Sequence, residues 1–332
     1  MTTVAVVGAG NWGTALADLL ARNGHTVRLW AFEPDVVTSI NSHHVNPLYL
    51  SGLPLAPTLV ATSEAPTAVR GADVIVIAVP SHVFRTVVTG LSSAIGAGAS
   101  IVVATKGLEP GTLALLSEVT AEILPRNPVV VLSGPSFAEE VYRRQPTAVV
   151  AASTDPEAAR RVQDVFSTRE FRVYAHHDVI GVQLGGALKN VIAIAAGMLE
   201  GLGLGYNTRA ALITRGLAEI ARLGHAMGAD PLTFAGLAGM GDLVLTATGT
   251  LSRNRALGMA MAEGKTLDAW RAGHRTVAEG AETVRAAVAL AKRHQVDLPI
   301  CSQVHRILYE GQDARKAAVE LMERSLKSEG WQ

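Results

Sequence analysis

The first half of the chain alternates short apolar runs with stretches of helical periodicity. The apolar runs cover residues 3–8, 26–32, 73–79, 101–104, 129–132, 147–152 and 171–174. Runs that are apolar on both faces are typical of parallel strands buried between two layers of helices. Helical patterns separate these runs, for example over residues 13–23 and 155–167. The pattern therefore predicts an α/β fold built on a parallel sheet.

The second half of the chain loses the strand signals and keeps only helical periodicity. Helices are predicted over residues 178–202, 208–227, 231–237, 240–248, 254–263, 281–294 and 299–309. This change of period predicts a first domain over residues 1–177 and an all-helical second domain over residues 178–332. Lys189 and Glu200 interrupt the apolar stretch 179–204, so we expect a buried central helix and no membrane insertion.

A glycine motif, G-A-G-N-W-G, follows the first apolar run and opens a helical pattern. In this context Gly8 permits a tight turn, Gly10 lets a pyrophosphate approach the backbone, and Gly13 permits close packing of helix on strand. Glu33 ends the second run, 20 positions after Gly13. A carboxylate there accepts a ribose 2′-hydroxyl and repels a 2′-phosphate, which favours NAD(H). The alternatives are a turn without a ligand and a solvated charge.

Two lysines lie in apolar surroundings, although only six of the 29 basic residues are lysines. Lys106 follows the run 101–104, so its ammonium would face a cofactor or an anionic substrate, unless it is a solvated loop residue. Lys189 lies within G-G-A-L-K-N-V-I-A-I. Burial lowers the pKa of a lysine toward neutrality, which suits a proton donor and acceptor. The alternative is a structural lysine whose ammonium reaches water.

Asp242, in the second half of the chain, lies in an apolar segment and is expected to need a buried partner. Asp242 and Thr246 are spaced i, i+4 in the apolar segment G-M-G-D-L-V-L-T, so they share a helix face. A buried carboxylate and a buried ammonium offset each other's desolvation, so Lys189 is the expected partner of Asp242.

Two segments are candidate anion sites. Ser252-Arg253-Asn254-Arg255 opens a helix, where a hydroxyl, an amide, guanidinium groups and a helix N-terminus can together bind phosphate. The alternative is a capped helix with surface arginines. Residues 133–137, S-G-P-S-F, follow another apolar run and can present backbone N–H groups to an anion. Ser136 with Glu139 also predicts a capping box for a helix that begins at Phe137.

Composition excludes several classes of protein. Apolar residues make up 48% and the formal net charge is zero, so we expect neither disorder nor a field that attracts nucleic acid. One cysteine, Cys301, allows no internal disulfide and fits a reducing compartment. The chain enters a strand pattern at once, so we expect no secretory signal. Adjacent histidines do not share a helix face, so we expect no metal site.

The motifs together resemble those of one enzyme family. GAGNWGTALA, VPSHVF, ATKGLE, SGPSFAEEV, GALKNVIAIAAG, GMGDLVLT, SRNRALG and VAEGAETV occur in this order over nearly the whole chain. They resemble the NAD(P)-dependent glycerol-3-phosphate dehydrogenases in their bacterial biosynthetic form. The resemblance implies a Rossmann-type domain followed by an all-α domain like the C-terminal domain of 6-phosphogluconate dehydrogenase.

The resemblance also implies an activity and its setting. The enzyme would be a cytoplasmic homodimer that interconverts sn-glycerol 3-phosphate and dihydroxyacetone phosphate to supply phospholipid synthesis. Its cofactor would be NAD(H), and also NADP(H). Many bacterial members carry a basic residue near position 32 or 33, whereas this chain has Phe32 and Glu33. We therefore expect NAD(H) to be used at least as well as NADP(H).

The resemblance assigns roles to matching residues. Lys189 would be the catalytic proton acceptor. The substrate would contact Lys106, Gly134, Ser136, Lys189, Asp242, Ser252, Arg253 and Asn254. The dinucleotide would contact Asn11, Trp12, Phe32, Lys106, Ala138, Arg253, Val277 and Glu279. To these the glycine motif and its spacing add Gly8, Gly10, Gly13 and Glu33.

Two other functions stay open at this point. A β-hydroxyacid or hydroxyacyl-CoA dehydrogenase of the same architecture would not need a phosphate site at Ser252–Asn254. A regulator that senses NAD(H) without turnover would have no use for a proton acceptor such as Lys189.

Overall fold

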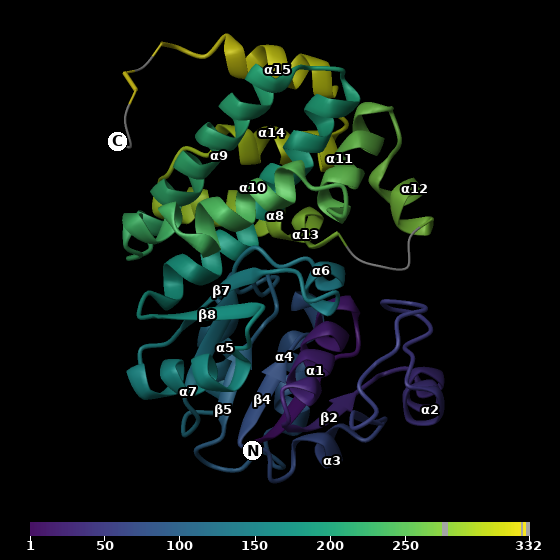
Figure 1. Ribbon diagram of the computed structural model, residues 1–332. Coiled ribbons are helices and arrows are strands. Elements are labelled where there is room, and N and C mark those ends of the chain that lie inside the picture. Colours follow the sequence, from purple (N-terminus) through teal and green to yellow (C-terminus); the bar gives the residue numbers. More distant parts are fainter. Residues whose placement is uncertain (274–277, 327, 330–332) are drawn as a thin grey trace. The chain divides into compact units, whose positions relative to one another are not determined.

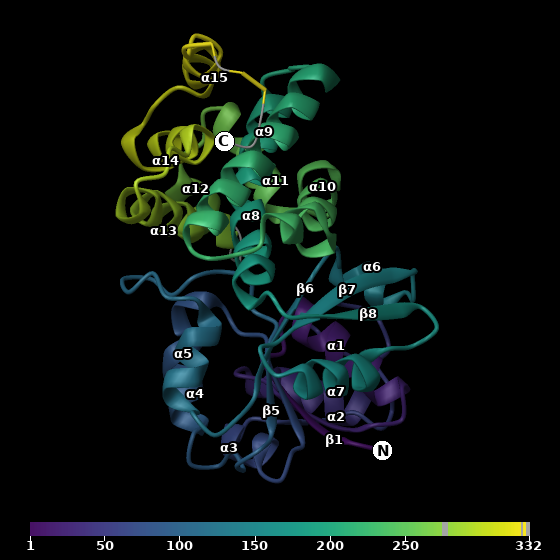
Figure 2. The ribbon, with the colours of Figure 1, turned by 90° about the vertical axis from the view of Figure 1, so that its left-hand side faces the viewer.

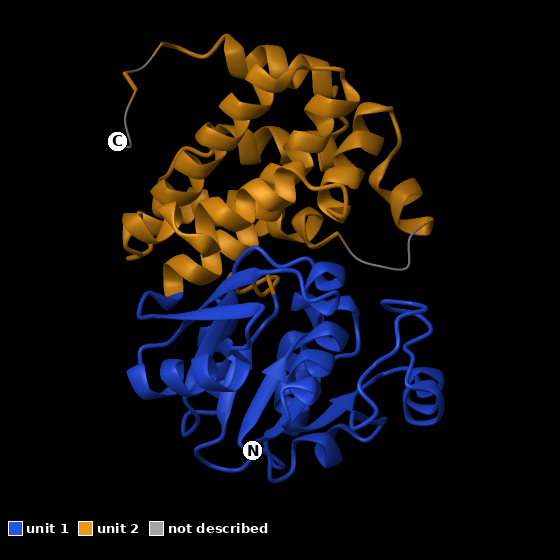
Figure 3. Ribbon diagram, viewed as in Figure 1, with its two compact units in different colours: residues 1–105, 114–179 blue, residues 106–113, 180–332 orange. Residues whose placement is uncertain are grey.

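The computed structural model describes residues 1–273, 278–326 and 328–329 (Figure 1). The chain divides into two compact units, Met1–Thr105 with Ala114–Val179, and Lys106–Leu113 with Ile180–Gln332 (Figure 3). The segment Lys106–Leu113 thus belongs to the second unit although it precedes residue 177 in the chain. An ion pair of Lys106 with Asp242 and a hydrogen bond from Arg293 to the Thr112 carbonyl tie this segment to the second unit.

One eight-stranded sheet forms the centre of the first unit. Its strands are β1 (Thr3–Val7), β2 (Thr26–Trp30), β3 (Val60–Thr62), β4 (Val74–Ile77), β5 (Ser100–Val103), β6 (Val129–Ser133), β7 (Thr147–Ala152) and β8 (Phe171–His176). The order β3-β2-β1-β4-β5-β6-β7-β8 contains the Rossmann order over its first six strands. Neighbouring strands are parallel except β6 and β7, which are antiparallel. The sheet is therefore mixed, whereas the sequence predicted a parallel sheet. Strand β3 was not predicted, because three residues are too few to show a period.

Helices cover both faces of this sheet. They are α1 (Asn11–Arg22), α2 (Pro34–His43), α3 (Ala65–Val69), η1 (Ser81–Val83), α4 (Phe84–Leu91), α5 (Leu116–Ile123), α6 (Ala138–Tyr142) and α7 (Pro156–Phe166). Figure 2 shows α3, α4 and α5 on one side and α1 and α7 on the other. Every residue of β4 and β5 is buried, which is why these segments are apolar on both faces. The α/β fold class is confirmed.

The second unit is helical throughout the part that the structure describes. Its elements are α8 (Val179–Gly201), α9 (Tyr206–Ala226), η2 (Pro231–Ala235), η3 (Leu237–Gly241), α10 (Asp242–Thr248), α11 (Arg253–Ala262), α12 (Leu267–Ala272), α13 (Glu279–His294), α14 (Pro299–Glu310) and α15 (Ala314–Met322). Helices α12 and α15 were not predicted from the sequence.

Helix α8 is the core of the second unit. By length and composition it could cross a membrane, but 89% of its most apolar window is buried inside the protein. The expected buried central helix is therefore confirmed. Glycines bring α8 and α11 into backbone contact: a Cβ at Gly197 would lie 1.9 Å from the Arg255 carbonyl oxygen, and one at Gly258 would lie 1.9 Å from the Ile194 carbonyl oxygen.

We predict that Gly258→Ala destabilises the helical unit by at least about 1–3 kcal/mol, because the added methyl group forces the two backbones apart. The midpoint of thermal unfolding, followed by circular dichroism, measures this loss. Gly273→Ala is the matched control, since a Cβ there would meet no atom closer than 3.7 Å. Equal midpoints for the two variants would contradict the close packing of α8 on α11.

Candidate active site

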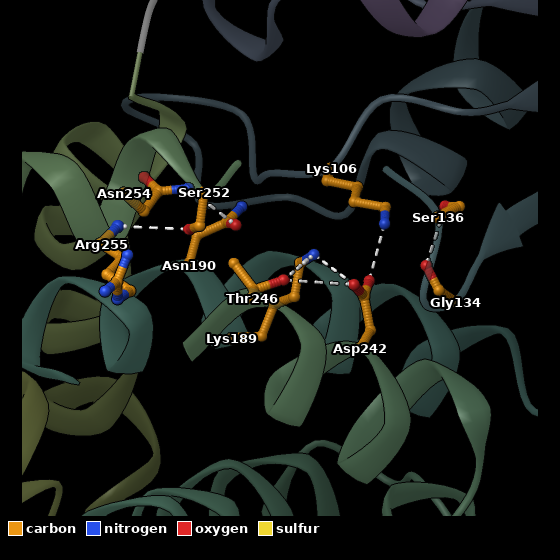
Figure 4. A network of polar contacts seen from close by, with 10 residues as sticks. All are labelled: Lys106, Gly134, Ser136, Lys189, Asn190, Asp242, Thr246, Ser252, Asn254 and Arg255. Atoms are coloured by element: carbon orange, nitrogen blue, oxygen red, sulfur yellow. Dashed lines mark hydrogen bonds and ion pairs between the residues drawn. The ribbon is translucent and has the colours of Figure 1, made fainter. Parts of the chain in front are cut away.

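A buried ion pair joins α8 to α10 in the second unit (Figure 4). Lys189 projects from α8 and is 6% exposed, and Asp242 is the first residue of α10 and is 1% exposed. The Lys189 ammonium donates to Asp242 Oδ1 and, at 2.7 Å, to Thr246 Oγ1. Thr246 lies one turn after Asp242 and donates to the same carboxylate at 3.3 Å. The pairing of Lys189 with Asp242 expected from the sequence is confirmed.

A second lysine binds the same carboxylate. Lys106 Nζ lies 2.6 Å from Asp242 Oδ2, so Lys106 and Lys189 share one carboxylate between them. The three groups together carry one net positive charge when both lysines are protonated. Nothing in the sequence indicated this contact, because Lys106 and Asp242 are 136 positions apart.

Burial sets the proton affinity of Lys189. Desolvation lowers the pKa of Lys189 from 10.5 to about 7; the charge of Asp242 opposes this shift, and the charge of Lys106 adds to it. Both protonation states are therefore populated near neutral pH. A general acid and base works best when its pKa lies near the working pH, so the site is suited to proton transfer.

The start of α11 supplies polar groups to the same unit. Ser252 caps the helix, and its hydroxyl accepts the Arg255 N–H at 3.2 Å. The Arg255 guanidinium binds the Glu200 carboxylate, with Nε 2.8 Å from Oε2. Arg253 is the first residue of the helix and is exposed. Residues 252–255 thus form a capped helix start, in which Arg255 is bound to Glu200.

Asn254 links three helices. Its amide nitrogen donates to Asn190 Oδ1 at 2.9 Å, and its amide oxygen accepts the Gly280 N–H at 2.9 Å. Asn190 follows Lys189 on α8, and Gly280 lies in the first turn of α13. Sequence reasoning did not single out Asn190, whose only signal was its place beside Lys189. Glu279 begins α13, whereas Val277 lies outside the described residues.

The glycine motif of the first unit has the form that a dinucleotide requires. Gly8 has φ +112°, and a Cβ at Gly13 would lie 1.8 Å from the Gly8 carbonyl oxygen. Gly10 is the N-cap of α1, and a Cβ there would meet nothing within 4 Å. The turn itself therefore requires Gly8 and Gly13, whereas Gly10 leaves the N-terminus of α1 open to a phosphate.

The side chains near this turn are compatible with the same ligand. Trp12 Nε1 is buried and has no hydrogen-bond partner among the described residues. Asn11 accepts the Leu50 N–H at 3.0 Å. Phe32 is 80% exposed just beyond β2, and the Glu33 carboxylate accepts the Tyr49 hydroxyl at 3.1 Å. An unused donor, an open aromatic face and a carboxylate are groups that can bind a nucleotide.

The loop after β6 differs from one expectation. Ser136 Oγ donates to the Gly134 carbonyl at 2.9 Å and does not cap a helix. Helix α6 begins at Ala138, and its N-cap is Phe137, so the predicted capping box is wrong. Gly134 has φ +144°, and a Cβ there would lie 2.9 Å from the Val149 Cα. The hydroxyl completes this tight turn and is not available to the helix.

Comparison with known proteins covers almost the whole chain. Residues 3–159 match the family profile described as NAD-dependent glycerol-3-phosphate dehydrogenase N-terminus, and residues 178–319 match the profile of its C-terminus. The glycerol-3-phosphate dehydrogenase (NAD(P)+) of Citrifermentans bemidjiense is 53% identical over 330 residues, which cover 98% of each chain. That of Myxococcus xanthus is 51% identical over 327 residues, with the same coverage.

Solved structures are similar as well. A glycerol-3-phosphate dehydrogenase from Coxiella burnetii is 44% identical, with a TM-score of 0.93 over 97% of this chain and 99% of that chain. The Saccharomyces cerevisiae enzyme is 28% identical, with a TM-score of 0.83 over the same shares.

We predict that Lys106→Met raises the pKa of Lys189, because it removes a positive charge that disfavours a second one and leaves Asp242 to Lys189 alone. The ¹³Cε resonances of the chain's six lysines can be followed in a pH titration. Lys316→Met removes an exposed lysine of the same unit and should leave the pKa of Lys189 unchanged. A lower pKa in Lys106→Met would show that the shared carboxylate is described wrongly.

Proposed function

The chain belongs to the NAD-dependent glycerol-3-phosphate dehydrogenase family, and we propose how its residues divide the work of that reaction. It is an NAD(P)-dependent oxidoreductase that interconverts sn-glycerol 3-phosphate and dihydroxyacetone phosphate. In our proposal residues 1–177 form the dinucleotide-binding domain, residues 178–332 form the domain that binds the substrate and moves the proton, and each domain adds contacts to the other's ligand. The enzyme acts as a cytoplasmic homodimer and supplies glycerol 3-phosphate for phospholipid synthesis.

The dinucleotide would be held first by its pyrophosphate. Gly8, Gly10 and Gly13 shape the N-terminus of α1, where unpaired N–H groups and the helix dipole favour an anion. The remaining contacts of the proposal are Asn11, Trp12, Phe32, Glu33, Lys106, Ala138, Arg253, Val277 and Glu279. A dinucleotide held there would supply the hydride chemistry at C2 of the substrate.

Lys189 would transfer the proton. In the reductive direction its ammonium donates a proton to the C2 carbonyl oxygen, and in the oxidative direction the neutral amine takes the proton of the C2 hydroxyl. Asp242 and Thr246 orient the amine, since both are bonded to Nζ. The observation that carries this proposal is a buried lysine held by a carboxylate and a hydroxyl in a chain of this family.

The substrate phosphate would bind at the start of α11. Ser252, Arg253 and Asn254 combine a hydroxyl, a guanidinium and an amide with a ten-residue helix whose N-terminus favours anions. Gly134, Ser136 and Lys106 complete the substrate contacts of the proposal. Because Arg255 is bound to Glu200, Arg253 is the arginine of this motif that we assign to the phosphate.

A turnover assay distinguishes this function from its alternatives. Oxidation of NADH should proceed with dihydroxyacetone phosphate and not with β-keto acids or acetoacetyl-CoA. Preference for a substrate without phosphate would support another dehydrogenase of this architecture. Tight NADH binding without any turnover would support a sensor.

We predict that Lys189→Ala lowers kcat by about 10²–10⁴-fold, the usual contribution of a positioned acid or base, while NADH affinity is nearly kept. In the wild type, the reductive kcat should fall as pH rises through about 7, because the ammonium is the donor. The oxidative kcat should rise over the same range, because the neutral amine is the acceptor. A purified variant with near-full turnover would exclude Lys189 as the acid and base.

We predict that Arg253→Lys raises KM for dihydroxyacetone phosphate strongly, because an ammonium cannot reproduce the planar two-point contact of a guanidinium. Unphosphorylated dihydroxyacetone should show little change. Arg285→Lys alters a largely exposed arginine of the same unit and serves as the control. If Arg253→Lys impairs both substrates equally, its role is structural or concerns the cofactor.

We predict that NADH is used at least as well as NADPH, and that Glu33→Arg lowers the NADH-to-NADPH ratio of kcat/KM at least about tenfold. Two unit charges at 4 Å interact by about 1 kcal/mol in water and about 4 kcal/mol near a protein surface, so replacing repulsion by attraction suffices. Glu64→Arg is the matched control, because Glu64 is the exposed N-cap of α3 as Glu33 is the N-cap of α2. A wild type that prefers NADPH tenfold would refute the prediction.

A further inference from the structure

The backbones of α8 and η3 approach closely one turn before the ion pair. A Cβ at Gly185 would lie 2.5 Å from the Ala238 carbonyl oxygen and 3.1 Å from its carbonyl carbon. Gly185 precedes Lys189 by four positions on α8, and Ala238 precedes Asp242 by four positions. The backbone contact and the ion pair are therefore successive contacts between the same two segments.

The segment that carries Asp242 has an unusual backbone. Residues 237–241 form a π-helix, in which the Gly241 N–H donates to the Gly236 carbonyl at 3.1 Å. The turn also packs against the preceding backbone, since a Cβ at Gly239 would lie 2.1 Å from the carbonyl oxygen of Phe234, five positions earlier. π-Helical turns are rare and occur frequently at functional sites. Here the turn ends at the residue before Asp242.

We propose that Gly185 is a positioning residue for the acid and base: by admitting the Ala238 carbonyl to the face of α8, it sets the separation at which Asp242 meets Lys189. This inference rests on the proposed role of Lys189. In this inference Gly185 contacts neither substrate nor cofactor. It acts by fixing the position of Asp242 relative to Lys189, the residue that transfers the proton.

The expected effect of a larger residue follows from the distances. A methyl group at Gly185 would need roughly 1 Å more room to reach an ordinary contact with the Ala238 oxygen, so η3 and α10 must move away from α8. Asp242 moves with them, and its contact with Lys189 weakens. Asp242 and Lys106 are the charged groups that act on Lys189 among the described residues, and Asp242 is the one that favours the ammonium. The ammonium of Lys189 then loses stabilisation.

A purely structural explanation makes a different prediction. Gly201, the last residue of α8, is also a close-packed glycine: a Cβ there would lie 2.7 Å from the Ala262 Cβ and 3.0 Å from the Met259 carbonyl oxygen. It lies three turns from Lys189 on the same helix. If Gly185 serves only helix packing, Gly185→Ala and Gly201→Ala should act alike.

The experiment compares these two variants in the full-length enzyme. The pKa of Lys189 is read from its ¹³Cε resonance, and kcat and KM are measured with dihydroxyacetone phosphate and NADH. In Gly185→Ala we expect the pKa to fall by about one unit, a tenfold change in proton affinity. We expect kcat to fall about 10²-fold, as is typical for a misplacement of 1 Å, with little change in KM for NADH. Gly201→Ala should lose stability and keep the pKa.

A longer carboxylate tests the geometry directly. In the Gly185→Ala background, Asp242→Glu should move the pKa of Lys189 back toward its wild-type value, because the added methylene spans the wider gap. A folded Gly185→Ala with an unmoved pKa, an equal shift in Gly201→Ala, or no restoration by Asp242→Glu would overturn the inference.

A second variant tests the inference if Gly185→Ala does not fold. If Gly185→Ala does not fold, Gly239→Ala disturbs the same π-helix through its contact with the Phe234 carbonyl oxygen and is judged by the same pKa. If neither variant folds, the positioning role is rejected. Because the pKa is read without turnover, the result is independent of the proposed function. That function fails separately if Lys189→Ala remains active.

Discussion

The carboxylate of Asp242 is the group through which the polar side chains at the candidate site of the second unit are connected. Asp242 is almost completely buried and contacts Lys106, Lys189 and Thr246. A buried charge is tolerated only when it is paired and hydrogen-bonded, so each lysine depends on Asp242 and Asp242 depends on both. With two cations on one anion, neither lysine is fully compensated. Burial is the main reason why the pKa of Lys189 is lowered to about 7; the charge of Lys106 adds to this shift, and the charge of Asp242 opposes it.

Another buried carboxylate shows that burial alone does not make an active site. Glu219 on α9 accepts the backbone N–H groups of Ile300 and Cys301 at 2.6 and 3.2 Å, and thereby caps α14. Burial raises the pKa of Glu219 to about 7. These two hydrogen bonds come from backbone groups, which cannot change their charge. Glu219 therefore fastens one helix to another, whereas Asp242 faces two titratable amines.

In both units glycines stand where two backbone segments approach closely, because glycine has no Cβ that would keep them apart. In the first unit Gly13 allows α1 to contact the turn at Gly8. In the second unit Gly197 and Gly258 bring α8 and α11 together, and Gly185 admits η3. A short separation between backbones fixes the positions of the side chains that follow on each element. In both units these glycines therefore stand where a side chain would collide with the backbone of a neighbouring segment.

The sequence by itself determined the elements that depend on local pattern. Apolar runs predicted seven of the eight strands, and helical periods predicted α1, α7 and most helices of the second unit. The glycine spacing predicted the turn after β1, and the burial of Lys189 required a partner such as Asp242. Only the tertiary structure decided that Lys106 shares that carboxylate, that Asn254 bridges Asn190 and the start of α13, and that β7 runs antiparallel to β6. The physical reason is range: periodicity and capping act over a few residues, whereas an ion pair between positions 136 residues apart depends on distances that only the folded chain sets.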